Sequence, residues 1–136
     1  MKFGNGCWLQ REGIECFAPQ EAYFVTKKEN EVVICAPTHH IAHRGDTLGG
    51  INLTIRITSP ADEVIRVQTS HYLGVEDHGP HFDLNLDEGR AINAEELIVR
   101  AGSLALRINK SNWKMTYERD AKVMETSCIK SVLIPV

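Results

Sequence analysis

The strongest constraint on this chain is a two-residue hydrophobic period that recurs along its length. In residues 51–58, isoleucine and leucine alternate with asparagine, threonine and arginine. Successive side chains of a β-strand point to opposite faces, so this pattern indicates a strand with one dry and one wet face. The same alternation recurs in residues 65–70, 104–109 and 113–118. We therefore expect a chain built mainly from half-buried strands.

Shorter β-rich runs and turn signals complete this pattern. The runs cover residues 22–26, 31–36, 97–100 and 129–134. The polar turn signals between strands are residues 59–62, 109–112 and 119–122. The best helical candidate, residues 91–99, lacks a clean apolar face. About eight short strands, with turns roughly every 8–12 residues, predict an all-β chain folded as an antiparallel sandwich or barrel.

Composition excludes several classes of function. A chain of 136 residues has room for one domain with a real core, so we expect a single domain. The net charge of −3 argues against a nucleic-acid partner and against a polybasic membrane anchor. The sequence shows neither an apolar run of membrane-spanning length nor an apolar leader, so we expect a cytoplasmic location without membrane contact. Residues 97–136 carry seven bases against three acids, which we interpret as solvated strand faces.

Cysteines and histidines provide candidate metal ligands. No Cys-x-x-Cys pair occurs, so we expect reduced thiols rather than a zinc site. The four cysteines are Cys7, Cys16, Cys35 and Cys128. His39, His40 and His43 could hold zinc or nickel if the fold supplied a fourth ligand. No spacing rule supplies that ligand, so we favour ordinary loop histidines and expect no metal and no other cofactor.

The longest irregular stretch holds most of the other candidate binding residues. Residues 76–83 place two histidines and three carboxylates around a Gly-Pro turn, a composition that could suit a metal or acid–base chemistry. The interpretation that we favour is a tight turn anchored by His81 and Phe82. Trp8 precedes the first clear strand and could stack on a sugar ring. The candidate ligand-binding residues are His78, His81, Phe82 and Trp8.

The remaining large aromatic side chains fit a core better than a binding platform. Trp113 and Tyr117 share one face of an alternating run with Met115. Three large side chains on the dry face of a strand are expected to pack inward.

The order of several motifs resembles the N-terminal β-sandwich of bacterial α-xylosidases in glycoside hydrolase family 31. The resemblance extends over residues 2–125, and its most specific part is the Gly-Pro-His-aromatic loop. The motifs are residues 6–9 (Gly-Cys-Trp-Leu), 32–37, 53–60, 79–85 and 102–108. The resemblance implies a galactose-mutarotase-like super-sandwich, of which residues 1–136 form an incomplete N-terminal portion.

The resemblance also implies a function for a larger protein. Members of the family are retaining α-glycosidases, and their catalytic (β/α)₈ barrel follows the sandwich. A retaining mechanism needs two carboxylates about 5–5.5 Å apart, which the family places on the barrel. Its Trp-x-Asp-Met-type nucleophile motif does not occur here, because Leu-Gln follows Trp8 and Lys-Met follows Trp113. No residue of this chain therefore inherits a catalytic role. We expect a non-catalytic domain of an enzyme that hydrolyses terminal α-linked xylose or glucose from oligosaccharides.

Two other functions remain open at this point. The chain could be a stand-alone carbohydrate-binding module, or a cupin-like metal-binding β-barrel. If the chain is an accessory domain, its partners are its own catalytic barrel and, through the whole enzyme, a carbohydrate substrate. We then also expect self-association, because the surface that meets the barrel would be exposed.

Overall fold

The computed structural model describes residues 12–71, 93–95, 97–127 and 132–135, and these form three antiparallel sheets. A four-stranded sheet has the order β2–β3–β4–β5. Its strands are β2 (Phe24–Lys27), β3 (Glu31–Pro37), β4 (Asn52–Thr58) and β5 (Arg66–Ser70). A five-stranded sheet has the order β10–β9–β8–β7–β6. Its strands are β6 (Asn93–Glu95), β7 (Ile98–Ala101), β8 (Leu104–Asn109), β9 (Lys114–Arg119) and β10 (Lys122–Ser127).

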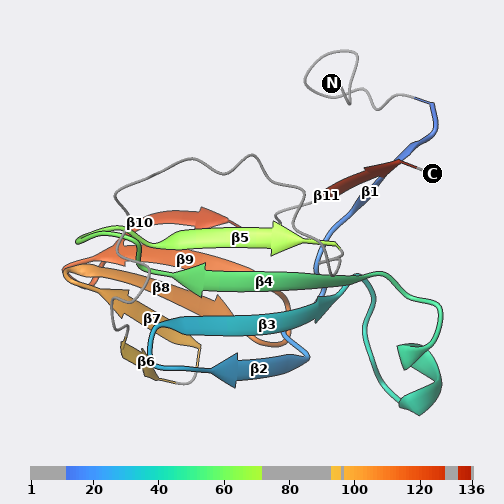
Figure 1. The fold of residues 1–136 in the computed structure, drawn as a ribbon, viewed down its shortest axis with the longest axis horizontal. Coiled ribbons are helices and arrows are strands. Elements are labelled where there is room, and N and C mark those ends of the chain that lie inside the picture. The colour runs from blue at the N-terminus through green and yellow to red at the C-terminus, as the bar shows by residue number, and fades with distance from the viewer. Residues whose placement is uncertain (1–11, 72–92, 96, 128–131, 136) are drawn as a thin grey trace.

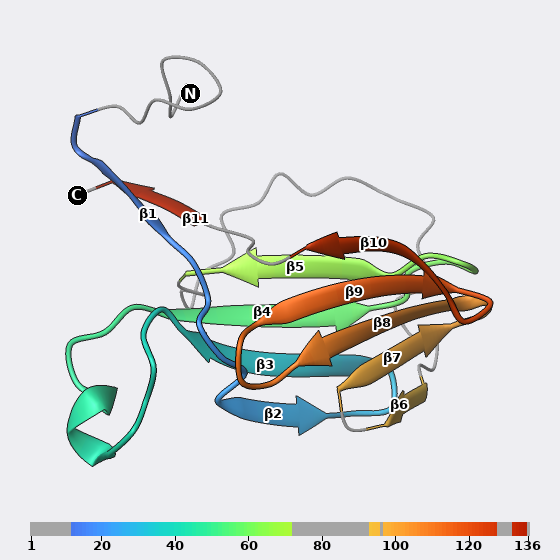
Figure 2. The same cartoon turned by 180° about the vertical axis from the view of Figure 1, so that it is seen from behind.

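The two larger sheets stack face to face as a sandwich (Figure 1). Strands β2 and β6 are the sheet edges on one side of the sandwich, and β5 and β10 are the edges on the other side, as both views show (Figure 2). The core between the sheets combines Ile34 and Ile55 from the four-stranded sheet with Leu106 and Met115 from the five-stranded sheet. The expectation of an all-β antiparallel sandwich is confirmed.

The two-residue period explains which side chains form this core. In β4, Leu53, Ile55 and Ile57 are at most 1% exposed, while Asn52 and Arg56 on the other face of the strand are exposed to solvent. Each fully buried side chain of this kind contributes about 1.5–3 kcal/mol through the hydrophobic effect. A register slip of one residue would turn this whole set outward, so the pattern also fixes how β4 pairs with β3 and β5.

The hairpin between β9 and β10 depends on an unusual turn. Arg119 pairs with Lys122, so only Asp120 and Ala121 form the loop. Their φ angles are +49° and +63°, the left-handed pair that a type I′ turn requires. The register of β10 then shifts between Val123 and Glu125, as in a β-bulge. This shift interrupts the alternation, which explains why the sequence did not predict β10.

Residues 91–99, the best helical candidate, are extended where the structure describes them, and the β-rich run predicted at residues 97–100 is confirmed as β7. Strands β6 and β7 cover most of that segment, and they pair with each other in antiparallel register. Ile98 and Val99 are β-branched and favour an extended backbone, and Val99 is fully buried in the core. Pairing with β8 then fixes the segment in the five-stranded sheet.

Trp113 also differs in part from the expectation. It lies in the turn before β9 rather than on the strand, and its φ angle is +44°. Its side chain is nevertheless fully buried in the core, as is that of Met115. The core assignment is confirmed, while the strand begins one residue later than the alternation indicated.

A separate two-stranded ribbon projects from the sandwich. Strand β1 (Ile14–Phe17) pairs with β11 (Val132–Pro135) in antiparallel register, from Ile14 opposite Pro135 to Phe17 opposite Val132. Both views show the ribbon leaving one end of the sandwich (Figures 1 and 2). No helix in the described part of the chain has the length and apolarity needed to cross a membrane.

Candidate functional site

The four candidate ligand-binding residues, His78, His81, Phe82 and Trp8, lie outside the described residues. Their assignment therefore stays a prediction, as does the anchored turn of residues 76–83. Two of the cysteines, Cys7 and Cys128, also lie outside. The other two, Cys16 and Cys35, are free thiols, as expected. Cys16 is exposed, whereas burial raises the pKa of the half-buried Cys35 thiol.

The three histidines of the 38–50 loop are each used to shape that loop. The His39 ring donates from Nε2 to the backbone carbonyl of Asp46 (2.6 Å). The His40 ring donates from Nδ1 to the Glu21 carboxylate (2.7 Å), and His43 accepts the Gly45 N–H at Nδ1 (3.1 Å). Within the described residues, no group of three or more histidine, cysteine, aspartate or glutamate side chains comes together as a metal site would require. The zinc or nickel hypothesis for this cluster therefore gains no support.

Two carboxylates complete the loop. Glu21 is only 8% exposed and accepts the backbone N–H of Ile41 (2.9 Å) in addition to the His40 bond. Asp46 accepts the N–H groups of Ala42 and His43, where the short 3₁₀ helix η1 (Arg44–Thr47) begins. A buried carboxylate needs such donors, because an ion without partners would be costly to desolvate. These acids therefore have structural partners.

A third carboxylate, that of Glu63, joins the two sheets at one end of the sandwich. Glu63, in the turn after β4, has a φ angle of +54°. Its carboxylate accepts the backbone N–H of Ser103 (2.6 Å) and the Ser103 hydroxyl, in the β7–β8 turn. These two bonds hold the pKa of Glu63 below its usual range, and the nearby Arg119 charge adds to the effect. Gly102 makes the contact possible, because a Cβ there would lie 2.0 Å from Glu63 Oε1.

A groove lies at the β2 edge of the sandwich. We call it the β2–β8 groove. It has a volume of about 900 Å³. Its apolar lining comes from Val25, Leu97, Ile98 and Ile108, and its basic lining from Lys27, Arg107, Lys110 and Lys114. The groove thus brings together β2 with the β8–β9 hairpin, segments that are far apart in the sequence.

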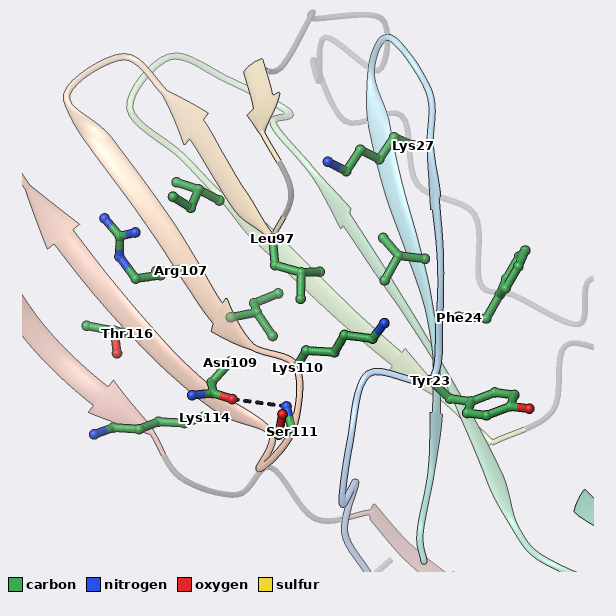
Figure 3. A pocket seen from close by; sticks show the side chains of 13 residues that line it. Tyr23, Phe24, Lys27, Leu97, Arg107, Asn109, Lys110, Ser111, Lys114 and Thr116 are labelled. Carbon is green, nitrogen blue, oxygen red and sulfur yellow. Dashed lines mark hydrogen bonds between the residues drawn. The ribbon is translucent and has the colours of Figure 1, made fainter. Parts of the chain in front are cut away.

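The charges of the β2–β8 groove are all of one sign. Figure 3 shows Lys27 on β2 and Lys110 in the turn after β8, with the Leu97 side chain close to Lys110. Arg107 bonds to Glu118 on the neighbouring strand (3.2 and 3.4 Å), but no acidic residue is among the described residues that line the groove. Ammonium groups above an apolar floor create a positive potential that attracts anionic groups. The groove is therefore suited to binding an amphipathic anion.

Sequence reasoning did not single out these groove residues. The only signal was the excess of bases in residues 97–136, which we had interpreted as solvated strand faces. The structure shows that Arg107, Lys110 and Lys114 from this region line one groove with Lys27. No periodicity or motif links Lys27 to the other three, because their proximity depends on how the two sheets stack.

Comparison with known proteins adds a family to this geometry. No family model matches the chain. Alpha-xylosidase XylQ of Lactiplantibacillus pentosus is 31% identical over 131 residues, which cover 93% of this chain and 17% of that protein. An alpha-xylosidase of Emericella nidulans is 36% identical over 115 residues, which cover 80% of this chain and 14% of that protein. The chain thus spans less than a fifth of the length of either relative.

The fold is an all-β antiparallel sandwich, and the matches are to small parts of two much longer proteins that are each named as an alpha-xylosidase. They support assignment of the chain to glycoside hydrolase family 31, as an N-terminal segment of an α-xylosidase-type enzyme. This agrees with the resemblance found in the sequence motifs.

Proposed function

We propose that residues 1–136 form a single β-sandwich domain, the non-catalytic N-terminal domain of a larger retaining α-glycosidase. That enzyme would release terminal α-linked xylose or glucose from oligosaccharides. One observation carries the proposal. The similarity to two alpha-xylosidases extends over 93% and 80% of this chain but over only 17% and 14% of theirs. A segment that matches over nearly its whole length, and folds around its own core, fits a domain within a larger protein.

The role of such a domain is to support a catalytic barrel. A retaining mechanism places one carboxylate as nucleophile and another as acid/base, about 5–5.5 Å apart across the scissile bond. In this chain, the carboxylates of Glu21, Asp46 and Glu63 accept hydrogen bonds that hold loops and turns in place. We assign the aspartate pair to the barrel outside these residues, and to this sandwich the task of positioning that barrel.

The size of the native protein tests this proposal most directly. An antibody raised against the chain should detect, in a lysate of the source cells, a band several times larger than 15.2 kDa. The immunoprecipitated protein should hydrolyse an aryl α-xyloside, while a precipitate made with pre-immune serum should not. A band at 15.2 kDa alone, or a large protein without this activity in the immune precipitate, would refute the proposal.

Sugar binding by the chain alone is a second candidate function, because two adjacent aromatic side chains are exposed. Tyr23 is 48% and Phe24 is 63% exposed, and large apolar side chains in this state often mark binding surfaces. Titration calorimetry with xylose and maltose should show heat that disappears in a Tyr23→Ser/Phe24→Ser variant. Leu48→Ser is the matched control, because Leu48 is 81% exposed in the 38–50 loop, away from β2. Absence of heat at millimolar sugar would eliminate this candidate.

A further inference from the structure

We propose that the β2–β8 groove is a docking site for an extended acidic segment of polypeptide that also carries apolar side chains. This inference rests on the proposed function, because the segment would come from the remainder of the parent enzyme. The groove would then be one of the contacts through which the sandwich holds its catalytic neighbour.

Charge is the first argument for this occupant. Four basic side chains line the groove, and the described lining contains no acid. Lys110 lies close to Leu97 (Figure 3), so a carboxylate bound above this apolar side chain would be placed to pair with the Lys110 ammonium group. The chain as a whole has a net charge of −3, so this basic surface runs against the overall balance. Such a local concentration of one sign selects a partner of the opposite sign.

The apolar floor is the second argument, because it distinguishes a polypeptide from a simple anion. Val25 and Leu97 are only partly buried and pack on the core cluster, which leaves part of each facing the groove. Inorganic phosphate would leave this surface in contact with water. A segment in which apolar and acidic side chains alternate would cover the floor and place its carboxylates at the lysines.

The edge position of β2 is the third argument. β2 has a hydrogen-bonded neighbour only on the β3 side among the described strands, so its other edge is available for strand addition. Extended peptides commonly bind by adding a strand to such an edge. β2 is four residues long and ends in Lys27, features that discourage pairing with another copy of the same edge. An acidic strand would instead be attracted by Lys110 and Lys114 in the groove.

The parent enzyme offers ample sequence for such a segment. More than four fifths of each alpha-xylosidase relative lies outside the part that matches this chain. A segment tethered in the same polypeptide also binds at a high effective concentration, so weak individual contacts are sufficient.

The test uses the 136-residue chain and three capped peptides. In each peptide, valine or leucine alternates with a polar residue, and the apolar positions are the same in all three. The polar positions of the peptides are all glutamate, all glutamine or all lysine. In a ¹⁵N-correlated NMR titration, the glutamate peptide should shift the backbone amides of residues 23–27 and 107–114. It should bind at least about tenfold more tightly than the glutamine peptide, which corresponds to about 1.4 kcal/mol. The lysine peptide should not bind, and added salt should weaken the glutamate complex.

Reversing the charge of one lysine in the groove tests whether the peptide binds there. Lys110→Glu should weaken binding of the glutamate peptide about tenfold, the size expected when an attractive charge becomes repulsive. Lys122→Glu is the matched control, because Lys122 is an exposed lysine on β10, the edge at the opposite side of the sandwich. It makes the same change in net charge and should leave the affinity within about twofold. A retained dispersion of amide signals will show that each variant is folded.

Several outcomes would overturn the inference. Equal affinities of the glutamate and glutamine peptides would show that charge does not drive binding. Amide shifts confined to residues outside 23–27 and 107–114 would show that the peptide does not bind in the groove. Tighter binding of a single-stranded oligonucleotide or a neutral xylo-oligosaccharide at the same amides would assign the groove to another class of ligand. The immunoblot separates the two proposals: a large native protein without peptide binding refutes only the groove. A 15.2 kDa native protein refutes the domain assignment whatever the peptides do.

Discussion

Replacement of Trp113 offers the sharpest check of the core. Its side chain is 0% exposed, its φ angle is +44°, and its indole N–H has no acceptor among the described residues. Three effects therefore compete in each variant. Trp→Ala in a core costs about 3–5 kcal/mol. A left-handed backbone strains a non-glycine residue by about 1–2 kcal/mol, and a buried unpaired donor costs about 1–3 kcal/mol.

These magnitudes predict an order of stabilities. Trp113→Phe loses roughly 40 Å² of buried apolar surface, or about 1 kcal/mol, but removes the unpaired N–H. The two changes nearly cancel, so we expect a shift in the free energy of unfolding below about 1 kcal/mol. Trp113→Ala should lose about 3–5 kcal/mol. Trp113→Gly should be about 1 kcal/mol more stable than Trp113→Ala, the reverse of the usual order in regular structure, because glycine relieves the backbone strain.

Equilibrium unfolding in urea, followed by far-ultraviolet circular dichroism, measures all three variants without relying on tryptophan fluorescence. If Trp113→Phe costs as much as Trp113→Ala, the indole N–H has an acceptor and the reasoning about its burial is wrong. If Trp113→Gly is less stable than Trp113→Ala, the backbone at this position is not left-handed in solution.

The other predictions concern a glycine, an acid and two thiols. Gly102→Ala should destabilise the protein by more than Gly49→Ala. Both glycines have positive φ angles, so each substitution costs about 1–2 kcal/mol of backbone strain. Only at Gly102 would the new Cβ also collide with Glu63. Urea midpoints of the two variants compare them directly, and equal losses would show that the Glu63 contact is not tight. The hydrogen bonds from Ser103 lower the pKa of Glu63 in the folded state. These bonds therefore stabilise the fold fully above roughly pH 4.3, the ordinary pKa of glutamate. The stabilisation is lost as the pH falls through the lowered pKa. Acid titration of thermal stability should therefore show a smaller loss for Glu63→Gln than for the unchanged chain, and parallel curves would contradict the assignment. Iodoacetamide should modify exposed Cys16 faster than Cys35, whose pKa is raised by burial, as peptide mass mapping over time will show; equal rates would mean that Cys35 is accessible and not perturbed.

The sequence predicted those strands whose buried face coincides with the apolar positions of the two-residue period. β4 and β8 alternate over most of their length because one face of each is buried against the opposite sheet, although Ala105 on the predicted wet face of β8 is buried as well. β10 was not predicted, because as an edge strand it has little burial to impose a period, and its bulge shifts the register near Val123. In residues 91–99, the β-rich run predicted a strand only from residue 97 onward, and the pairing of β6 with β7 extends the sheet to residues 93–95.

The candidate site was harder to foresee than the fold. The prominent histidines His39, His40 and His43 suggested chemistry because of their proximity in sequence, yet each ring has its own partner within the loop or on Glu21. Lys27 and Lys110 were unremarkable in the sequence, and they line one groove only because the β2 edge lies beside the β8–β9 hairpin. A site made by the stacking of two sheets has no linear motif.

The β1–β11 ribbon has a consequence for the order of folding. Its pairing joins residues more than a hundred positions apart, from Phe17 with Val132 to Ile14 with Pro135. Closing a loop of that length costs about 4 kcal/mol of chain entropy, and a two-stranded ribbon is only marginally stable by itself. The ribbon therefore closes after the sandwich has already brought its ends together. Substitutions in it should leave the refolding rate unchanged and accelerate unfolding, so that the ribbon acts on the lifetime of the native state.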